Sequence, residues 1–221
     1  MPNFSTFSSL LRITTKYEMP AVRTRILAAV LDAYPDTFEG LTPSKQIGER
    51  VFASPTPHPN EVLNLFVQQK LTSALPMAYY MAARRGLESL MDARLPASAR
   101  LSTEILRSVM KGLLALRETE FKEVHRLIFG PRGSKSCLRS DCPSRAATGP
   151  RVSEAHQRVV GRITDSAHSG TKILQVLLLK EVCGGDCFGF CENCVEGWEA
   201  GHADVRKNAW CMLPDVFGLK G

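Results

Sequence analysis

Cysteine is the residue type in this sequence whose spacing best suits chemistry. The chain has seven cysteines in 221 residues, an odd number, and its N-terminus lacks the pattern of a secretory signal. A framework of disulfides is therefore not expected. Four residues separate Cys137 from Cys142, and two separate Cys191 from Cys194. Four thiolates complete the tetrahedral shell of a zinc ion at Zn–S distances of about 2.3 Å. We therefore predict a structural zinc ion bound by Cys137, Cys142, Cys191 and Cys194.

Other arrangements of thiols compete with this site. Cys183 and Cys187 form a third pair, and His202 and Cys211 are further candidate ligands. Free thiols, packed or exposed, are the alternative to any metal site. A redox role for the Cys-x-x-Cys at 191–194 lacks the βαβ context of a thioredoxin-like motif. The sequence therefore leaves the ligand set open.

No other pattern in the chain supports catalysis. None of the five histidines stands in a nucleophile motif, and the sequence lacks G-x-S-x-G, phosphate-loop and H-E-x-x-H patterns. A zinc ion held by four thiolates has no open position for a water molecule, so it would be structural. We therefore expect a protein that is not an enzyme.

The positive charge of the chain is concentrated in one stretch. The 28 basic and 22 acidic residues give a net charge of +6, and residues 131–180 hold nine bases against three acids, 9 − 3 = +6. Such a stretch can contact phosphate or an acidic partner. No aromatic residue lies between Arg132 and Lys180, so the bases of single-stranded nucleic acid would find no stacking platform. Nucleic-acid binding is not expected, and a zinc-containing nucleic-acid binder that uses 131–180 is the alternative function.

The elements that must position these residues are helices. Apolar residues recur with the helical period, and proline and glycine mark the ends of the segments. We expect an all-α fold, an irregular helical array with a long central helix and a cysteine-containing C-terminal helical segment. We divide the chain into a helical hairpin at 1–40, a helical scaffold at 41–130, and a basic loop with C-terminal helices at 131–221. A first helix ends at Met19-Pro20, and the other expected helices are Pro20–Tyr34, Pro59–Lys70, Pro76–Arg85 closed by Gly86, Leu87–Met91, Ser102–Phe129, Ser153–His168, Thr171–Val182 and Cys191–Cys211.

Each main helix has an expected buried face. In the first helix, Phe7, Leu10, Leu11 and Tyr17 fall on one face. The expected inward residues of the later helices are Val22, Ile26, Val30 and Leu31; Val62, Leu63 and Phe66; Tyr79 and Tyr80; Leu106, Met110, Leu113, Leu114, Phe121, Val124 and Ile128; and Trp198 and Trp210.

Several segments resemble one protein family. The run FSSLLRITTKYEMPAVRTRILAAVLDAYP resembles the helical hairpin that closes a BTB/POZ domain. The segments LPMAYYMAARRG, LSTEILRSVMKGL and RKNAWCMLPDVFGL are similar to the C-terminal helical part of fungal BTB-domain proteins. By this resemblance, we expect the chain to lack the strand-rich half that begins a BTB domain. The resemblance implies a BTB protein without its front half, and it leaves self-association open.

The resemblance implies a function in protein–protein interaction, as an adaptor or scaffold with an unidentified protein partner. The hairpin should expose apolar side chains such as Leu10, Tyr17 and Val30, because the usual BTB neighbours are missing. The longest apolar run near the C-terminus, Val176–Leu179, is far shorter than the roughly 20 residues of a membrane span. We expect a soluble protein in the cytoplasm or nucleus.

Overall fold

The computed structural model describes residues 3–31, 34–41, 52, 56–129, 173–174 and 192–219. These residues form seven α-helices and one short 3-10 helix, and the part of the chain so described contains no strand. This confirms the expected all-α class. The chain divides into two compact units, residues 1–113 with 213–221, and residues 114–212. The functional segmentation at 1–40, 41–130 and 131–221 stays a prediction.

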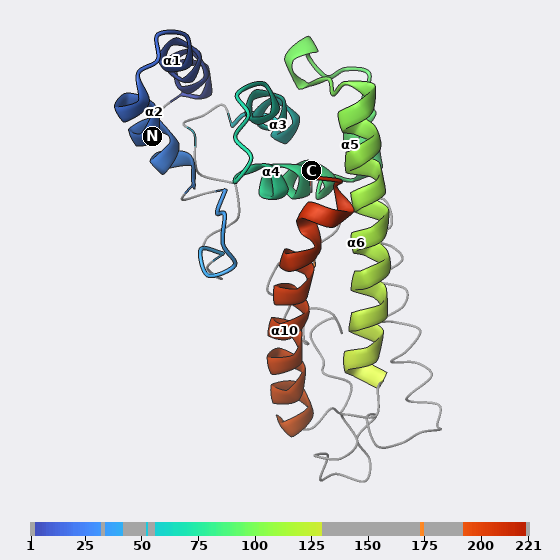
Figure 1. The fold of residues 1–221 in the computed structure, drawn as a ribbon. Helices are drawn as coiled ribbons and strands as arrows, with labels where there is room; N and C mark the ends of the chain where they lie inside the picture. Colours follow the sequence, from blue (N-terminus) through green and yellow to red (C-terminus); the bar gives the residue numbers. More distant parts are fainter. Residues whose placement is uncertain are drawn as a thin grey trace. The chain divides into compact units, whose positions relative to one another are not determined.

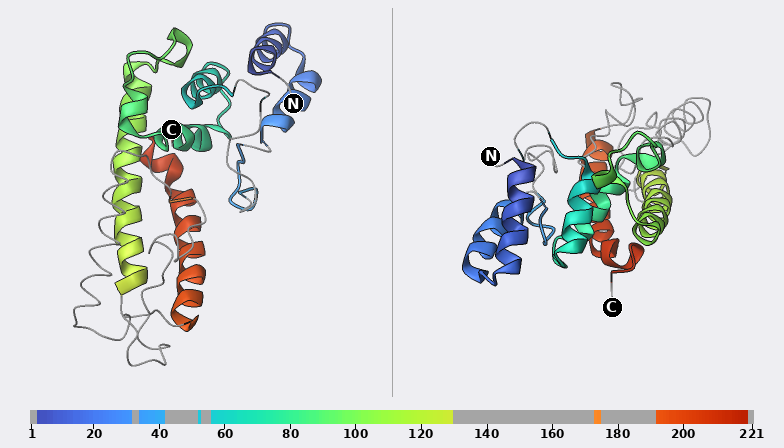
Figure 2. Two further views of the ribbon diagram at one scale, coloured as in Figure 1. Left: turned by 180° about the vertical axis from the view of Figure 1, so that it is seen from behind. Right: turned by 90° about the horizontal axis from the view of Figure 1, so that it is seen from above.

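Helices α1 (Phe4–Lys16) and α2 (Pro20–Leu31) form a hairpin in the first unit, and they lie side by side in Figures 1 and 2. Asn3 caps α1, because its side-chain oxygen accepts a hydrogen bond from the Ser5 N–H at 2.9 Å. The helix ends at Lys16, and Glu18 follows its C-terminal cap Tyr17 with a φ of 49°, which lets the Met19 N–H reach the Thr14 carbonyl at 2.9 Å. Proline at position 20 then begins the second helix, as the sequence predicts.

The hairpin buries a narrower face than the sequence predicts. Phe7 and Leu11 are buried, whereas Leu10, Tyr17 and Val22 are exposed. The inward assignment of Val22 is therefore wrong, whereas the exposure of Leu10 and Tyr17 agrees with the expected lack of neighbours for these two side chains. The physical reason is that apolar residues cover too wide an arc of each short helix for one neighbour to bury. Ile26 is half-buried, and the side chains of Val30 and Leu31 lie outside the described residues.

Helices α3 (Pro59–Gln68) and α4 (Leu75–Ala83) pack against each other in the same unit. The expected core residues Val62, Leu63 and Phe66 are all buried, and so are Tyr79 and Tyr80. Burial of side chains this large contributes roughly 1.5–3 kcal/mol each, so this pair is the centre of the first unit. Tyr34 extends the core, with its ring centroid 5.1 Å from that of Phe66.

Two short elements follow, α5 (Gly86–Leu90) and the 3-10 helix Ala97–Ala99. Gly86 does not close α4 as expected, since α4 ends at Ala83 and Arg84 is its C-terminal cap. Gly86 instead begins α5 with a φ of 80°. Glycine suits this position because a left-handed backbone costs it little.

Helix α6 (Thr103–Phe129) is the expected long helix, and Ser102 caps it by accepting the Ile105 N–H at 3.4 Å. Its buried face differs from the prediction. Val109, Leu113 and Leu116 are buried, whereas Leu114 is 59% exposed and Phe121 is 38% exposed. The buried face is thus rotated by about one residue, or about 100°, from the expected stripe.

Leu106 and Met110 of the expected stripe are half-buried, and the side chains of Val124 and Ile128 lie outside the described residues. Gly112 explains the rotation, because its missing side chain lets the Phe217 ring approach the α6 backbone. The small residue, rather than the largest apolar ones, decides which side of α6 is covered.

Helix α10 (Glu192–Val216) begins as predicted but runs beyond the expected end at Cys211, through Pro214. The segment Leu213–Phe217, which lies beyond the expected end of the helix, buries Leu213 and Phe217. Gly218 then ends the helix with a φ of 70°, and the Leu219 N–H donates to the Pro214 carbonyl at 2.7 Å. Burial of the two apolar side chains and this glycine cap outweigh the backbone hydrogen bond that Pro214 cannot donate.

Of the expected aromatic anchors on α10, Trp210 is half-buried and the side chain of Trp198 lies outside the described residues. The expected helices Ser153–His168 and Thr171–Val182 also lie outside them, apart from Ile173 and Leu174, which are buried.

Candidate interaction surface

The predicted zinc ligands cannot be placed. Cys137, Cys142 and Cys191 lie outside the described residues, and Cys194 lies in α10 with its side chain outside them. Among the described residues, no group of three or more His, Cys, Asp and Glu side chains is arranged to hold a metal ion. The zinc site and its competing ligand sets therefore stay predictions.

A polar cluster surrounds the N-terminus of α3. The imidazole Nδ1 of His58 accepts the Asn60 N–H at 3.2 Å, while the His58 N–H donates to the Glu61 carboxylate at 3.1 Å. This reciprocal pair is a capping box. The His58 Nε2 lies 3.3 Å from the Ser89 hydroxyl. The cluster brings a serine, a histidine and a glutamate together, which are the residue types of a catalytic triad.

The cap decides the chemistry of this cluster. Because Nδ1 accepts a hydrogen bond, a neutral His58 carries its proton on Nε2 and donates it to Ser89. A histidine in that tautomer cannot take a proton from the serine, so this pair is not a nucleophile with its base. Burial and the nearby Arg85 lower the pKa of His58, against smaller opposing effects of Glu61 and Asp92. The cluster acts as a helix cap.

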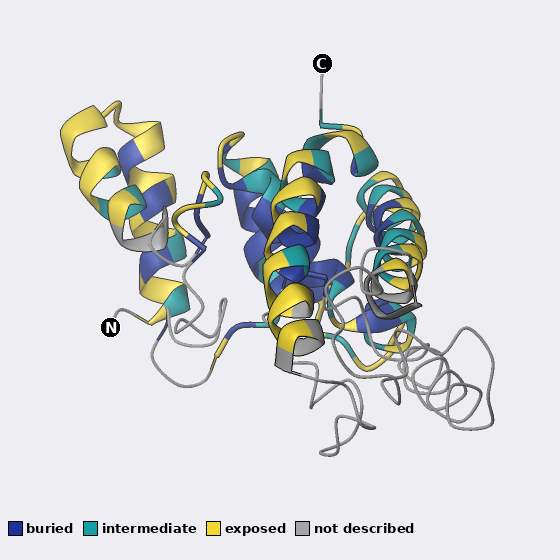
Figure 3. Cartoon of the chain, turned by 90° about the horizontal axis from the view of Figure 1, so that it is seen from below, coloured by how far each residue is buried: buried dark blue, intermediate teal, exposed yellow. Residues whose placement is uncertain are grey.

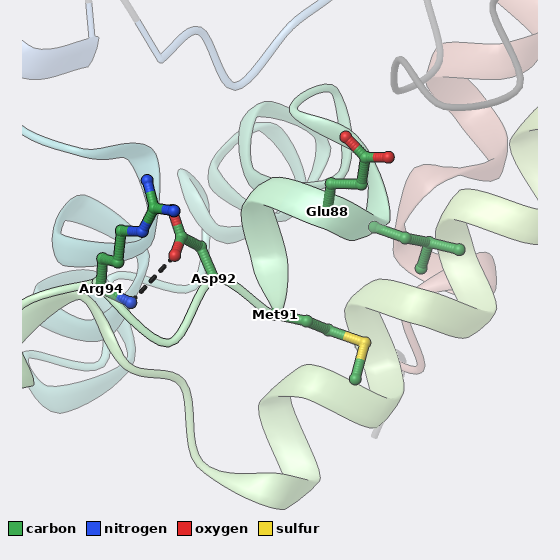
Figure 4. A pocket seen from close by; sticks show the side chains of 5 residues that line it. Glu88, Met91, Asp92 and Arg94 are labelled. Carbon is green, nitrogen blue, oxygen red and sulfur yellow. Dashed lines mark hydrogen bonds between the residues drawn. The ribbon is translucent and has the colours of Figure 1, made fainter.

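A shallow depression beside α5 is lined by Leu87, Glu88, Met91, Asp92 and Arg94. In Figure 4 the labelled side chains point in different directions, and the drawn hydrogen bond is from the Arg94 N–H to Asp92 at 2.9 Å. A small-molecule site needs polar groups that converge on an enclosed apolar space. This depression has neither feature.

The hairpin carries the most distinctive surface among the described residues. Eight large hydrophobic side chains are exposed among all the described residues, and five of them lie between residues 10 and 22. We call these five side chains the hairpin apolar surface, and they are Leu10, Ile13, Tyr17, Met19 and Val22. Figure 3 shows the hairpin mostly in the exposed colour. Single exposed apolar residues are ordinary, but a cluster of them marks an interaction site.

The fold of α1 presents part of this surface on one face. Leu10, Ile13 and Tyr17 follow the spacing i, i+3, i+7, so they line one side of the helix. Their exposed fractions are 43%, 47% and 65%. Met19 lies in the connection and Val22 in the first turn of α2. The surface therefore follows α1 and the start of α2.

The opposite side of α1 anchors the hairpin to its unit. Phe7 is buried with its ring centroid 5.4 Å from that of Phe52. The Arg12 guanidinium donates to the Gln68 side chain at 3.3 Å, and the Thr15 hydroxyl donates to that of Gln69 at 2.8 Å. These contacts join α1 to the C-terminal end of α3. The exposed apolar side chains therefore lie on a helix that is packed against its own unit.

The hairpin is also basic. Residues 3–31, which span its two helices, include Arg12, Lys16, Arg23 and Arg25 and one acid, Glu18, which gives 4 − 1 = +3. The Arg23 guanidinium donates to the Gln69 carbonyl at 3.0 Å. The Lys16 ammonium lies 5.6 Å from the centroid of the Tyr17 ring, within cation–π range. Positive charge therefore accompanies the exposed apolar side chains.

The second unit holds a buried basic pair on α10. His202 and Arg206 are only 4% and 8% exposed, and the Arg206 guanidinium donates to the Leu174 carbonyl at 2.9 Å. Burial, with a smaller effect of Arg206, lowers the pKa of His202 to about 4. His202 is therefore neutral at physiological pH, and its environment belongs to the packing of this unit.

Comparison with protein-family models, with curated proteins and with solved structures finds no match to this chain. The BTB/POZ resemblance therefore rests on the segments quoted from the sequence alone. Within the described residues, no helix combines the length and the apolarity that crossing a membrane requires.

Sequence reasoning predicted that Leu10 and Tyr17 would lack neighbours, but it missed Ile13 and Met19. The signal was available in α1, where Phe7, Leu10, Leu11 and Ile13 cover more of the helix circumference than one packed neighbour can bury. An apolar arc of that width on a helix of 13 residues indicates two contact faces, one for the core and one for another surface.

Proposed function

We propose that this chain is a non-catalytic protein–protein interaction protein, an adaptor or scaffold, that binds its partner through the hairpin apolar surface. The observation that carries the proposal is the concentration of exposed large apolar side chains between residues 10 and 22. An exposed cluster of this kind loses solvent contact when a partner covers it, and that loss drives association. The cytoplasmic or nuclear location is part of the same proposal.

Two further points support it. The capping tautomer of His58 argues against Ser89, His58 and Glu61 as a catalytic group. The resemblance of the first forty residues to the hairpin of a BTB/POZ domain also implies an interaction protein. The alternative, a zinc-containing nucleic-acid binder, depends on residues 131–180, and all of these except 173 and 174 lie outside the described part of the chain.

A display library of helical peptides tests the proposal with the full chain. We expect peptides enriched on the wild type to bind the double variant Ile13→Ser/Tyr17→Ser at least roughly tenfold more weakly, a loss of about 1.4 kcal/mol or more. Met91→Ser is the matched control, because Met91 is as exposed as Tyr17, at 65%, but lies outside the hairpin. Far-UV circular dichroism confirms that the variants keep their helices. Enriched peptides that bind the double variant as well as the wild type would refute the proposal.

A further inference from the structure

The chemistry of the hairpin narrows the class of partner, if the proposed function holds. We propose that the hairpin apolar surface binds an acidic amphipathic helix of a partner protein. Three observations carry this inference: the spacing of the exposed side chains on α1, the position of the exposed cations beside them, and the presence of a single acid between residues 3 and 31.

The spacing fits a helical ligand. Leu10, Ile13 and Tyr17 lie on one face of α1, and the seven steps from Leu10 to Tyr17 rise by about 10 Å along the axis. A partner helix that places apolar side chains at i, i+3, i+4 and i+7 covers a similar length with a matching stripe. Met19 adds a flexible thioether, which adapts to partner side chains of different shape.

The cations stand beside the apolar side chains. Lys16 follows Ile13 by three residues, and Arg25 follows Val22 by three residues, so each cation is a helical neighbour of an exposed apolar side chain. Both cations are exposed, and neither forms an ion pair with another described residue. A partner helix with Glu or Asp flanking its apolar stripe would pair with them.

Charge argues against two other occupants. A second copy of the chain would bring one basic hairpin, of net charge +3, against another, and like charges repel across an interface. An anionic membrane attracts clusters of roughly four to eight Lys and Arg residues. Hydrogen bonds to Gln68 and Gln69 direct the guanidinium groups of Arg12 and Arg23 toward α3, which leaves only Lys16 and Arg25 beside the surface. An acidic helix requires only the exposed cations that border the surface.

A charge-swap experiment on the full chain tests the inference. The probe is a fluorescent 14-residue amphipathic peptide with a leucine stripe and flanking glutamates, and its counterpart has the same stripe with flanking lysines. We expect the acidic peptide to bind the wild type at least roughly tenfold more tightly than the basic one. Lys16→Glu/Arg25→Glu should reverse the preference, and raised salt should weaken only the favourable pairs. Lys111→Glu, an exposed lysine on α6, is the control that should change neither affinity.

The outcomes separate the inference from the proposed function. Equal binding of both peptides that is lost in Ile13→Ser/Tyr17→Ser would overturn the acidic partner and keep the interaction surface. Loss of neither peptide in that variant would overturn both. Binding to vesicles of anionic phospholipid without binding to the acidic peptide, or concentration-dependent dimerisation through the hairpin in sedimentation, would replace the inferred occupant by a membrane or a second copy.

Discussion

The α1–α2 hairpin and the α3–α4 pair are both rich in apolar residues, but they bury very different shares of them. Eight of the 12 residues of α2 are Ala, Val, Ile or Leu, yet none of its residues 20–28 is buried. Every residue of α4 from Met77 to Ala83 is buried. Neighbours make the difference, because α4 packs on α3 and α5 and also against Phe217, whose ring centroid lies 5.2 Å from that of Tyr79. Apolar content alone therefore does not tell which helix stabilises the fold and which is available to a partner.

The largest effect should come from shortening a core side chain of the α3–α4 pair. We expect Phe66→Ala, at a position that is 0% exposed, to lower the free energy of unfolding by about 3–5 kcal/mol. Tyr17→Ala on the hairpin, where the ring is 65% exposed, should change it by about 0.5 kcal/mol or less. Urea denaturation measures both. A comparable loss in the two variants would mean that Tyr17 stabilises the fold as much as Phe66 does. That result would contradict the difference between the hairpin and the α3–α4 pair.

A second test disrupts the packing of the Phe217 ring against Tyr79 of α4. A β-carbon on Gly112 would lie 2.0 Å from Cε1 of Phe217, so Gly112→Ala should displace the ring. We expect a loss near the upper end of the ~1–3 kcal/mol range of overpacking. Gly197→Ala is the matched control, because a β-carbon there meets no atom within 4 Å, and it should stabilise α10 by about 0.5–1 kcal/mol. Equal effects of the two substitutions in thermal unfolding would argue against the Phe217 contact.

The loss of stability at acid pH should arise from groups outside the hairpin. The folded state holds the pKa of His202 at about 4, below the roughly 6.5 of an unfolded histidine. Between these values the unfolded state binds more protons, so stability falls as the pH falls, by about 2 kcal/mol from pH 7 to pH 5. The lowered pKa of His58 acts in the same direction. Residues 3–31 contain no histidine, so the hairpin does not contribute to this loss.

His202→Gln is the variant that checks the origin of the acid effect. Urea unfolding at pH 7 and pH 5 should show a pH dependence reduced by most of the His202 contribution. A variant that keeps the full wild-type dependence would place the acid sensitivity in other groups.

The smallest effect concerns the residues of positive φ that follow α1 in the hairpin and α3 in the α3–α4 pair. Glu18 and Lys70 directly follow the C-terminal caps of α1 and α3, each with a positive φ, of 49° and 53°. Side chains other than glycine are strained in this conformation. Glu18→Gly and Lys70→Gly should therefore each stabilise the protein by up to about 1 kcal/mol. Gly218→Ala, at a φ of 70° in the same position of α10, should destabilise it by a similar amount. Melting temperatures that move in the opposite directions would contradict these assignments.

The sequence by itself determined the helical class, the long helix and most helix ends. Those features depend on local chemistry, namely the helical period and the capping and breaking residues Ser102, Pro20 and Pro59. It also indicated that part of the hairpin would lack neighbours. The four cysteines of the predicted zinc site lie where the structure describes no ligand side chains, so that hypothesis depends on metal analysis of the protein.

Only the tertiary structure decided which apolar face each helix buries. Val22, Leu114 and Phe121 are as apolar as the residues that are buried, and nothing in their local sequence marks them as exposed. Their exposure depends on what packs beside them, as Gly112 and Phe217 show, although 105 positions separate them in the chain. Burial is a property of contacts between distant segments, whereas helix formation is a property of neighbouring residues, so the sequence pattern predicts the second far better than the first.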